Sequence, residues 1–218
     1  MAKGILITFE GSEGCGKSTQ VERLGRHLRA LGYRVRTTRE PGGTSIGEEI
    51  RHTLKHSKDN AAMTAEAELL LMNASRAQLV REVIRPALEA GEIVLCDRYY
   101  DSTLAYQGYG RQLDLKMVQS VIDIAVGETR PHLTLLLTVA PDVAELRRAL
   151  RQSTLPFMRD RIEEADRQFF ERVEQGFAAI AAAEPTRFRT VEASGSAEGV
   201  AEKIWELARP VIPKIGRW

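Results

Sequence analysis

The feature that most constrains this chain is a glycine-rich turn at residues 11–18, which reads GSEGCGKS and matches the pattern G-x-x-x-x-G-K-[ST] in full. An apolar run at residues 5–9 precedes the turn, and an amphipathic stretch over about 17–31 follows it. The glycines let successive backbone N–H groups face the oxygens of a phosphate, and the N-terminus of the following helix adds partial positive charge. This strand–loop–helix unit predicts a nucleotide-binding α/β domain.

The residues of the turn have distinct predicted roles. Lys17 is expected to reach the β- and γ-phosphates of ATP, and the Ser18 hydroxyl is expected to ligate Mg²⁺. The residues expected to surround the ATP phosphates are Gly11, Ser12, Glu13, Gly14, Cys15, Gly16, Lys17, Ser18 and Thr19.

Short apolar runs alternate with stretches of helical periodicity along the whole chain. Strands are predicted at residues 5–9, 34–38, 93–96, 133–139 and 187–191. Helices are predicted at about 17–31, from 45 onward, at 64–88 with Pro86 ending or kinking it, at 114–126, 163–183 and 196–208. Ser45 and Glu48 have the spacing of a capping box. Strands separated by helices imply right-handed crossovers, so we predict one domain with a parallel sheet flanked by helices and a lid at about 147–162.

Charge and apolar patterning restrict the class of partner. The chain has 31 basic and 30 acidic residues, for a formal net charge of +1, which argues against a dedicated nucleic-acid binder. No apolar run approaches the roughly 20 residues of a membrane span, and residues 5–9 are too short for a signal segment, so we expect a cytoplasmic protein without a membrane partner.

Cys15 and Cys96 form no disulfide or metal spacing, and we expect both to fill tight spaces, with a reactive Cys15 as the alternative.

An aspartate and an arginine follow the third predicted strand. Asp97 can hold Mg²⁺ or its bound waters, and the planar fork of Arg98 suits a second phosphate. We therefore predict Ser18 and Asp97 as metal ligands. The chain lacks an N-K-x-D guanine-reading motif and an L-S-G-G-Q signature. A small-molecule kinase is thus favoured over a GTPase or a transporter ATPase.

Arginines crowd the segment between the fourth predicted strand and the next helix, at positions 147, 148, 151, 159 and 161. Phosphoryl transfer spreads negative charge over equatorial oxygens, so an arginine that closes over ATP can raise the rate strongly. The alternative is a solvated face in which neighbouring acidic residues pair with these arginines.

Five segments resemble the motifs of bacterial thymidylate kinases, in the same order along the chain. They are FEGSEG at 9–14, TREPGGT at 38–44, DRY at 97–99, DSTLAYQG at 101–108 and DRIE at 160–163. The resemblance implies a P-loop NTPase fold of the nucleoside-monophosphate-kinase type with five strands. It also implies transfer of a phosphoryl group from ATP to dTMP, with Mg²⁺, in a homodimer.

The same resemblance implies roles for particular residues. Arg39, Arg51 and Arg98 would hold the dTMP phosphate, and Glu13 would accept from the deoxyribose 3′-hydroxyl. Arg76, Thr103 and Gln107 would face the thymine edge, and Tyr106 would close the sugar side. The full implied dTMP set is Glu13, Arg39, Arg51, Met72, Arg76, Arg98, Ser102, Thr103, Tyr106 and Gln107. The implied catalytic set is Lys17, Asp97, Arg98 and the lid arginine Arg161. Residues 192–194 would border the adenine, and Pro41 would follow a cis peptide bond.

Two departures from the family pattern stand out. Met72 occupies the position of a phenylalanine that stacks on thymine, and a methionine sulfur covers a ring less well. The lid segment at 152–159 is longer than the shortest family versions.

Alternative functions remain open from the residues. A phosphate acceptor is mostly dianionic at pH 7 and needs alignment and charge neutralisation rather than a base. A deoxynucleoside kinase would need a base for its hydroxyl acceptor, and Glu40 could serve. Another pyrimidine monophosphate kinase and a non-catalytic nucleotide switch are further alternatives. His52 and His56 have the spacing of a metal pair, but a solvated helix face is favoured there.

Overall fold

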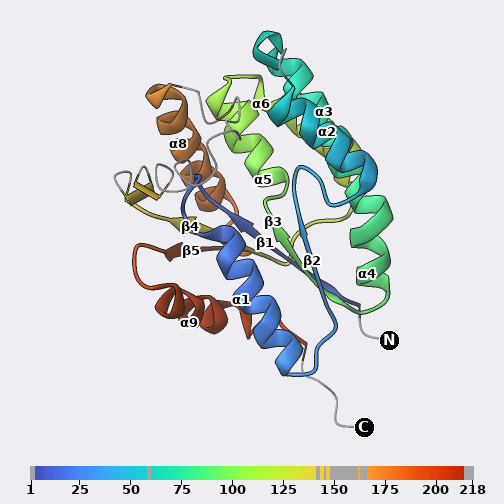
Figure 1. Cartoon of the computed structure of the whole chain (residues 1–218), viewed down its shortest axis with the longest axis vertical. Coiled ribbons are helices and arrows are strands. Elements are labelled where there is room, and N and C mark those ends of the chain that lie inside the picture. The colour runs from blue at the N-terminus through green and yellow to red at the C-terminus, as the bar shows by residue number, and fades with distance from the viewer. Residues whose placement is uncertain are drawn as a thin grey trace.

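The computed structural model describes residues 3–57, 60–140, 143–144, 146–147, 162 and 166–213, which form a parallel sheet covered by helices (Figure 1). The strands are β1 (Ile5–Glu10), β2 (Val35–Arg39), β3 (Ile93–Asp97), β4 (Leu133–Thr138) and β5 (Phe188–Glu192). Every pairing is parallel, in the order β2-β3-β1-β4-β5. The predicted five-stranded sheet is confirmed, and each strand boundary lies within one residue of its predicted position.

The helices fill the connections between the strands. The longer ones are α1 (Lys17–Ala30), α2 (Ser45–His56), α3 (Ala65–Leu79), α6 (Leu115–Val126), α8 (Arg167–Ala183) and α9 (Ala197–Ala208). The short ones are α4 (Arg85–Glu89), α5 (Tyr100–Thr103), a 3₁₀ turn at Asn60–Ala62 and two π-helical segments at Val80–Ile84 and Leu104–Gly110.

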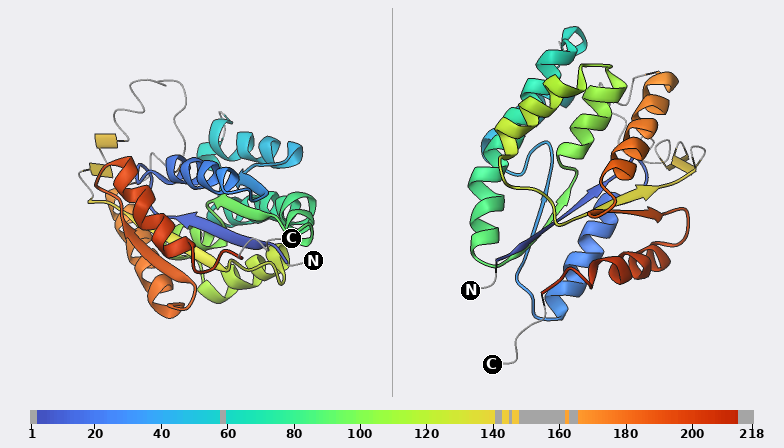
Figure 2. Two further views of the ribbon diagram at one scale, coloured as in Figure 1. Left: turned by 90° about the horizontal axis from the view of Figure 1, so that it is seen from below. Right: turned by 180° about the vertical axis from the view of Figure 1, so that it is seen from behind.

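Alternation along β1 explains why both faces of the sheet are covered. Successive side chains of a strand point to opposite faces, and a strand buried on both faces is apolar on both. Ile7 and Phe9 pack with α1 and α9, whereas Leu6 packs with α3 and α6. Figure 2, seen from behind in its right panel, accordingly shows α6 and α8 in front of the sheet and α1 behind it.

A third apolar cluster joins α8 to the π-helical segment Leu104–Gly110. Tyr106 lies edge-on to Phe169 and to Phe177, with ring centroids 6.1 Å apart in each pair. Such pairs stabilise a core beyond the area that they bury. This packing fixes the segment that carries Tyr106 and Gln107 against the rest of the domain.

The structure differs from the local predictions at three places. The cap of α2 is Thr44 rather than Ser45: Thr44 Oγ1 accepts from the Gly47 N–H, and Glu48 accepts from the Gly43 N–H instead of closing a capping box. Of the two alternatives predicted for Pro86, ending the helix is wrong, because helical structure continues to Glu89. Pro86 lies in the first turn of α4, directly after the π-helical segment, where its missing N–H is tolerated. The helical run at 100–110 was not predicted at all.

Parts of other predictions lie outside the described residues. The predicted helix start at Glu163 is one of them; the first described helical residue after it is Arg167, capped by Asp166. Of the predicted lid at 147–162, only its first and last residues are described. Both cysteines are buried and free, as expected for residues that fill tight spaces. Among the described residues, no helix combines the length and the apolarity needed to cross a bilayer.

Candidate active site

The carboxyl ends of three neighbouring strands bring the predicted site together. Asp97, at the end of β3, is in register with Phe9 of β1 on one side and with Arg39 of β2 on the other. The segments that follow these strands therefore leave the sheet at the same edge. In open parallel sheets this edge is where ligands bind.

The phosphate loop has the backbone that its glycines predict. Gly11, Gly14 and Gly16 have φ values of 134°, 78° and 96°, a region that other residues rarely adopt. A Cβ at Gly11 would lie 2.2 Å from the carbonyl oxygen of Leu137, so the loop cannot pass β4 with any side chain there. No side chain caps α1, which leaves the first N–H groups of that helix available to an anion.

Lys17 is folded onto the loop. Its side chain is buried, and its ammonium group donates to the carbonyl oxygens of Gly11 at 3.1 Å and Ser12 at 2.8 Å. The positive charge of Lys17 thus already lies where the loop would surround phosphate oxygens.

Ser18 and Asp97 meet at the mouth of the loop, where the Ser18 hydroxyl donates to Asp97 Oδ2. A hydroxyl and a carboxylate side by side are hard oxygen ligands of the kind that Mg²⁺ takes beside phosphates and water. Among the residues that the structure describes, no group of three or more His, Cys, Asp and Glu could hold a metal by itself. The Ser18–Asp97 pair fits an ion that would complete its coordination with phosphate oxygens.

Arg98 is held in an uncommon backbone conformation that turns it toward the loop. Its φ is 68°, a value that costs a non-glycine residue about 1–3 kcal/mol. Its N–H donates to the carbonyl oxygen of Phe9 at 2.9 Å, and its Nη1 donates to that of Gly11 at 3.1 Å. The guanidinium therefore lies beside the phosphate loop.

The surroundings of Arg98 hold it in place on the other side. Ser102 Oγ accepts from Nη1 at 3.1 Å and the Tyr106 hydroxyl accepts from Nη2 at 3.2 Å. Glu13 lies 3.9 Å from Nη2. Burial disfavours the charge, but Tyr106, Glu13 and Glu10 favour it, and on balance the pKa of Arg98 is raised. Arg98 thus stays a fixed cation between the loop and the neighbouring pocket.

Glu10, for which no role was predicted, supports this arrangement through Tyr99 and Ser102. It is fully buried and accepts from the Tyr99 N–H at 2.7 Å and from the Ser102 hydroxyl at 2.5 Å. Burial and the nearby charge of Asp101 raise the pKa of Glu10 well above its usual range. The available signal was a carboxylate at the end of an otherwise apolar strand, directly before the loop.

A pocket opens next to the loop and gathers most of the predicted acceptor residues. It is lined by Glu13, Glu40, Pro41, Lys55, Met72, Arg76, Arg98, Ser102, Thr103, Tyr106, Gln107 and Ile162. Eight of the ten predicted dTMP residues lie here. The remaining two, Arg39 and Arg51, line the adjoining cavity that contains the loop, together with Asp97. Glu13, Glu40, Lys55 and Arg98 line both spaces, so the two cavities are continuous.

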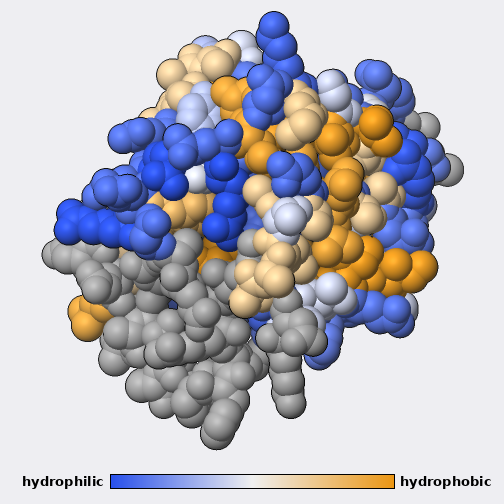
Figure 3. Space-filling model, turned by 90° about the horizontal axis from the view of Figure 1, so that it is seen from above, coloured by the Kyte–Doolittle hydropathy of each residue, from blue (hydrophilic) through white to orange (hydrophobic). Residues whose placement is uncertain are grey.

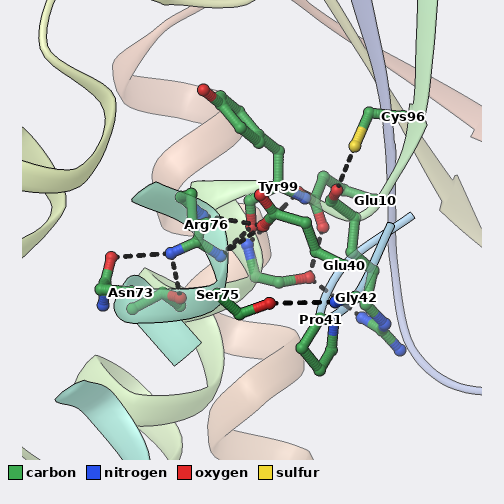
Figure 4. Close-up of polar contacts among 12 residues, drawn as sticks. Glu10, Glu40, Pro41, Gly42, Asn73, Ser75, Arg76, Cys96 and Tyr99 are labelled. Carbon is green, nitrogen blue, oxygen red and sulfur yellow. Dashed lines mark hydrogen bonds and ion pairs between the residues drawn. The ribbon is translucent and has the colours of Figure 1, made fainter. Parts of the chain in front are cut away.

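Arg76 and Glu40 form a buried ion pair at the floor of the pocket (Figure 4). Arg76 Nε and Nη2 each lie 2.7 Å from Glu40 Oε2, Nη1 donates to Asn73 and Thr103, and Nη2 donates to the Tyr99 carbonyl oxygen. Burial raises the pKa of Glu40 to about 7, although Arg76 opposes the shift. Apart from Glu40 Oε1, which has no hydrogen-bond partner among the described residues, the polar floor of the pocket is therefore paired before any ligand arrives.

The two arginines of the adjoining cavity are held by local contacts. Arg39 Nη2 donates to Glu48 at 2.9 Å, and Arg51 Nη1 donates to the Pro41 carbonyl oxygen at 2.9 Å. The peptide bond between Glu40 and Pro41 is cis, as the family resemblance implied. Both arginines therefore border the loop cavity from the side of β2 and α2.

The far end of the loop cavity is bordered by the segment after β5. Arg147, the first residue of the predicted lid, donates to the carbonyl oxygens of Ala193 at 3.2 Å and Gly14 at 3.4 Å. Ala193 and Gly195 line the cavity there. The predicted catalytic Arg161 lies outside the described residues.

Comparisons with known proteins agree on one family. The family model described as thymidylate kinase matches residues 9–204. A thymidylate kinase of Syntrophotalea carbinolica is 48% identical over 202 residues, which is 92% of this chain and 93% of that protein. One from Deinococcus radiodurans is 47% identical over 207 residues, 94% of this chain and 96% of that protein. The crystal structure of thymidylate kinase from Ehrlichia chaffeensis superposes with a TM-score of 0.76 at 29% identity, covering 95% of this chain and 99% of that one.

Proposed function

The chain belongs to the thymidylate kinase family, and from this premise we infer that it transfers the terminal phosphoryl group of ATP to dTMP, giving dTDP and ADP. The observation that carries the inference is the continuity of two anion-binding spaces. Arg98 lines both the loop cavity and the acceptor pocket, and its side chain contacts the loop on one side and Tyr106 on the other. Two nucleotides bound end to end would bring their phosphates together at this arginine.

The chemistry requires alignment more than acid–base catalysis. The phosphate of dTMP, with a second pKa of about 6, is mostly dianionic at pH 7 and is itself the nucleophile. Lys17 and the N–H groups of the loop would hold the ATP phosphates, and Arg98 would neutralise the acceptor phosphate. Glu13, beside Arg98, would accept from the 3′-hydroxyl. Arg161 would close over the transferred group.

The residues present also suit Mg²⁺, which would neutralise charge on the ATP phosphates. Ser18 and Asp97 would hold the ion, since their oxygens already meet at the mouth of the loop. Turnover should cease in excess chelator and return when MgCl₂ is added. Full activity in chelator would contradict the proposal.

We further propose a homodimer formed through the layer of α2, α3 and α6. Figure 3, which views the molecule from above, shows hydrophobic residues gathered toward α3 and α6, on the right, and hydrophilic ones on the opposite side. Leu70 is 58% exposed and Ile124 is 76% exposed, with Ile46, Leu115 and Met117 also exposed on these helices. Apolar patches of this kind mark interfaces. A monomer mass in light scattering at micromolar concentration would exclude the dimer.

The function is tested by comparing acceptors in a coupled ADP assay. We expect turnover with dTMP and none above background with thymidine. Turnover on thymidine but not on dTMP would instead indicate the deoxynucleoside kinase, which the comparisons do not favour. Tight ATP binding without turnover on any acceptor would indicate a nucleotide switch.

Replacing Met72 with phenylalanine should tighten dTMP binding. Met72 lines the acceptor pocket and packs against the cluster around Tyr106. A flat ring at this position could stack on thymine and gain about 0.5–1.5 kcal/mol, so we expect the KM for dTMP to fall by a factor between about 2 and 13 with kcat nearly unchanged. Leu31→Phe, at the exposed end of α1, is the control for adding a surface ring and should leave the KM unchanged. An unchanged KM in Met72→Phe would mean that the thymine ring does not lie against residue 72.

A further inference from the structure

Behind the acceptor pocket, the amide of Gln107 is held by a buried carboxylate to which the proposed reaction assigns no role. Gln107 lines the pocket and is 1% exposed. Its Nε2 donates to Glu68 Oε1 at 2.8 Å. Glu68 is also 1% exposed and lies on α3 one turn before Met72, so it faces the same side of the helix as a pocket residue.

The carboxylate of Glu68 is itself fixed. Arg111 donates through Nε to Oε1 at 3.2 Å and through Nη2 to Oε2 at 3.0 Å. The Arg111 guanidinium in turn lies 4.7 Å from the centre of the Phe169 ring. A salt-bridged carboxylate only accepts hydrogen bonds, so it can be faced by the NH₂ group of an amide but not by its carbonyl oxygen. Glu68 therefore sets which end of the Gln107 amide faces away from it.

The carbonyl oxygen of Gln107 is left for a ligand. No residue in the described part of the chain donates to Gln107 Oε1. This oxygen is also not one of the fully buried side-chain atoms that lack a partner, so it is open to the pocket that Gln107 lines. The neighbouring Arg76 has its donors committed to Glu40, Asn73, Thr103 and Tyr99. Because the Thr103 hydroxyl accepts from Arg76, its own hydrogen is free to be donated.

We propose that Glu68 is a positioning residue that holds the Gln107 carbonyl oxygen toward the pocket, so that the pocket selects a pyrimidine ring carrying N3–H. The proposal rests on the function proposed above. Thymine and uracil place an N3–H donor between two carbonyl oxygens, which matches the Gln107 acceptor beside the Thr103 donor. Cytosine presents an unprotonated N3, so two acceptors would face each other without a hydrogen. Leaving buried polar groups unpaired is how such sites reject a near-isosteric ligand.

The test is the ratio of kcat/KM for dTMP to kcat/KM for dCMP in the full-length protein at saturating ATP. In Glu68→Gln the new amide can donate to Gln107 Oε1. The Gln107 amide can then flip, so that its NH₂ group faces the pocket in place of its carbonyl oxygen. We expect the dTMP:dCMP ratio to fall about 100-fold, mainly through a higher KM for dTMP, with the KM for ATP unchanged. Removing the acceptor directly, in Gln107→Met, should lower the ratio to a similar extent.

The double variant separates positioning from a merely structural role. If Glu68 acts through Gln107, Glu68→Gln should cause no further change in the ratio when Gln107 is already methionine. The matched control is Glu82→Gln, because Glu82 accepts from Gln78 Nε2 at 2.7 Å on an exposed helix face; its ratio should equal that of the wild type. A folded Glu68→Gln with an unchanged ratio would overturn the proposal, and so would a further fall in the double variant. Should the wild type fail to use dTMP at all, the proposed function itself would be wrong.

Discussion

Replacing Lys17 with alanine is expected to lower kcat for dTMP phosphorylation by about 10³-fold without unfolding the protein. Lys17 is 7% exposed, and its ammonium group rests on the carbonyl oxygens of Gly11 and Ser12, at the centre of the loop. Removing a single preorganised donor from developing charge costs about 10²–10³ in kcat. Lys17 carries a full positive charge, so we place its effect at the upper end of that range.

The measurement is steady-state turnover at saturating ATP and dTMP, paired with a thermal melt. Lys116→Ala, an exposed lysine on α6, is the control and should retain wild-type kcat. A folded Lys17→Ala variant with near-normal turnover would exclude Lys17 from the mechanism. A lowered melting temperature together with lost activity would call for Lys17→Met, which keeps most of the side-chain volume and removes the charge.

Replacing Arg98 with alanine is expected to lower kcat/KM for dTMP by about 10³-fold while the KM for ATP changes less than about threefold. The guanidinium contacts Gly11 on the donor side and Tyr106 on the acceptor side. The acceptor phosphate would lose its main cation, whereas ATP would keep Lys17 and the N–H groups of the loop. The loss should therefore fall on the acceptor.

Arg98→Lys distinguishes charge from geometry at this position. Lysine keeps the positive charge but cannot contact Gly11, Ser102 and Tyr106 through one planar fork, so we expect an intermediate loss. Arg36→Ala, which removes an exposed arginine paired with Glu92, is the control for a general loss of positive charge. Unchanged kcat and KM for dTMP in Arg98→Ala would contradict the assignment of Arg98 to the acceptor phosphate. It would also mean that Arg98 does not link the loop cavity to the acceptor pocket in catalysis.

The sequence predicts β1, β3 and β4 well because each of these strands is a short, nearly continuous apolar run. β1 and β4 are buried on both faces, and their boundaries follow directly from hydrophobicity. The sequence does not predict the helical run at residues 100–110. In the stretch from Tyr100 to Gln107, polar side chains are buried together with apolar ones. A helix buried all round shows no amphipathic period, so no pattern marks it.

Site residues were predictable where the motif is contiguous. Residues 11–18 meet in space because they are neighbours in the chain, and Asp97 and Arg98 because they follow a strand next to β1. Glu10 is marked in the sequence only as a carboxylate that ends an apolar strand, and Glu68 carries no local signal. Neither glutamate reveals that its partner, Ser102 or Gln107, comes from another part of the chain.

The amino-acid sequence alone thus determined the phosphate loop, the parallel α/β class and the family to which the acceptor motifs point, because glycine spacing and hydrophobic alternation act over a few residues. Tertiary structure alone decided that Arg76 is committed to Glu40, that Arg98 spans two cavities and that Glu68 orients Gln107. The physical reason is that buried polar groups must find partners, and strand order and helix packing, not chain proximity, decide which partners come within reach.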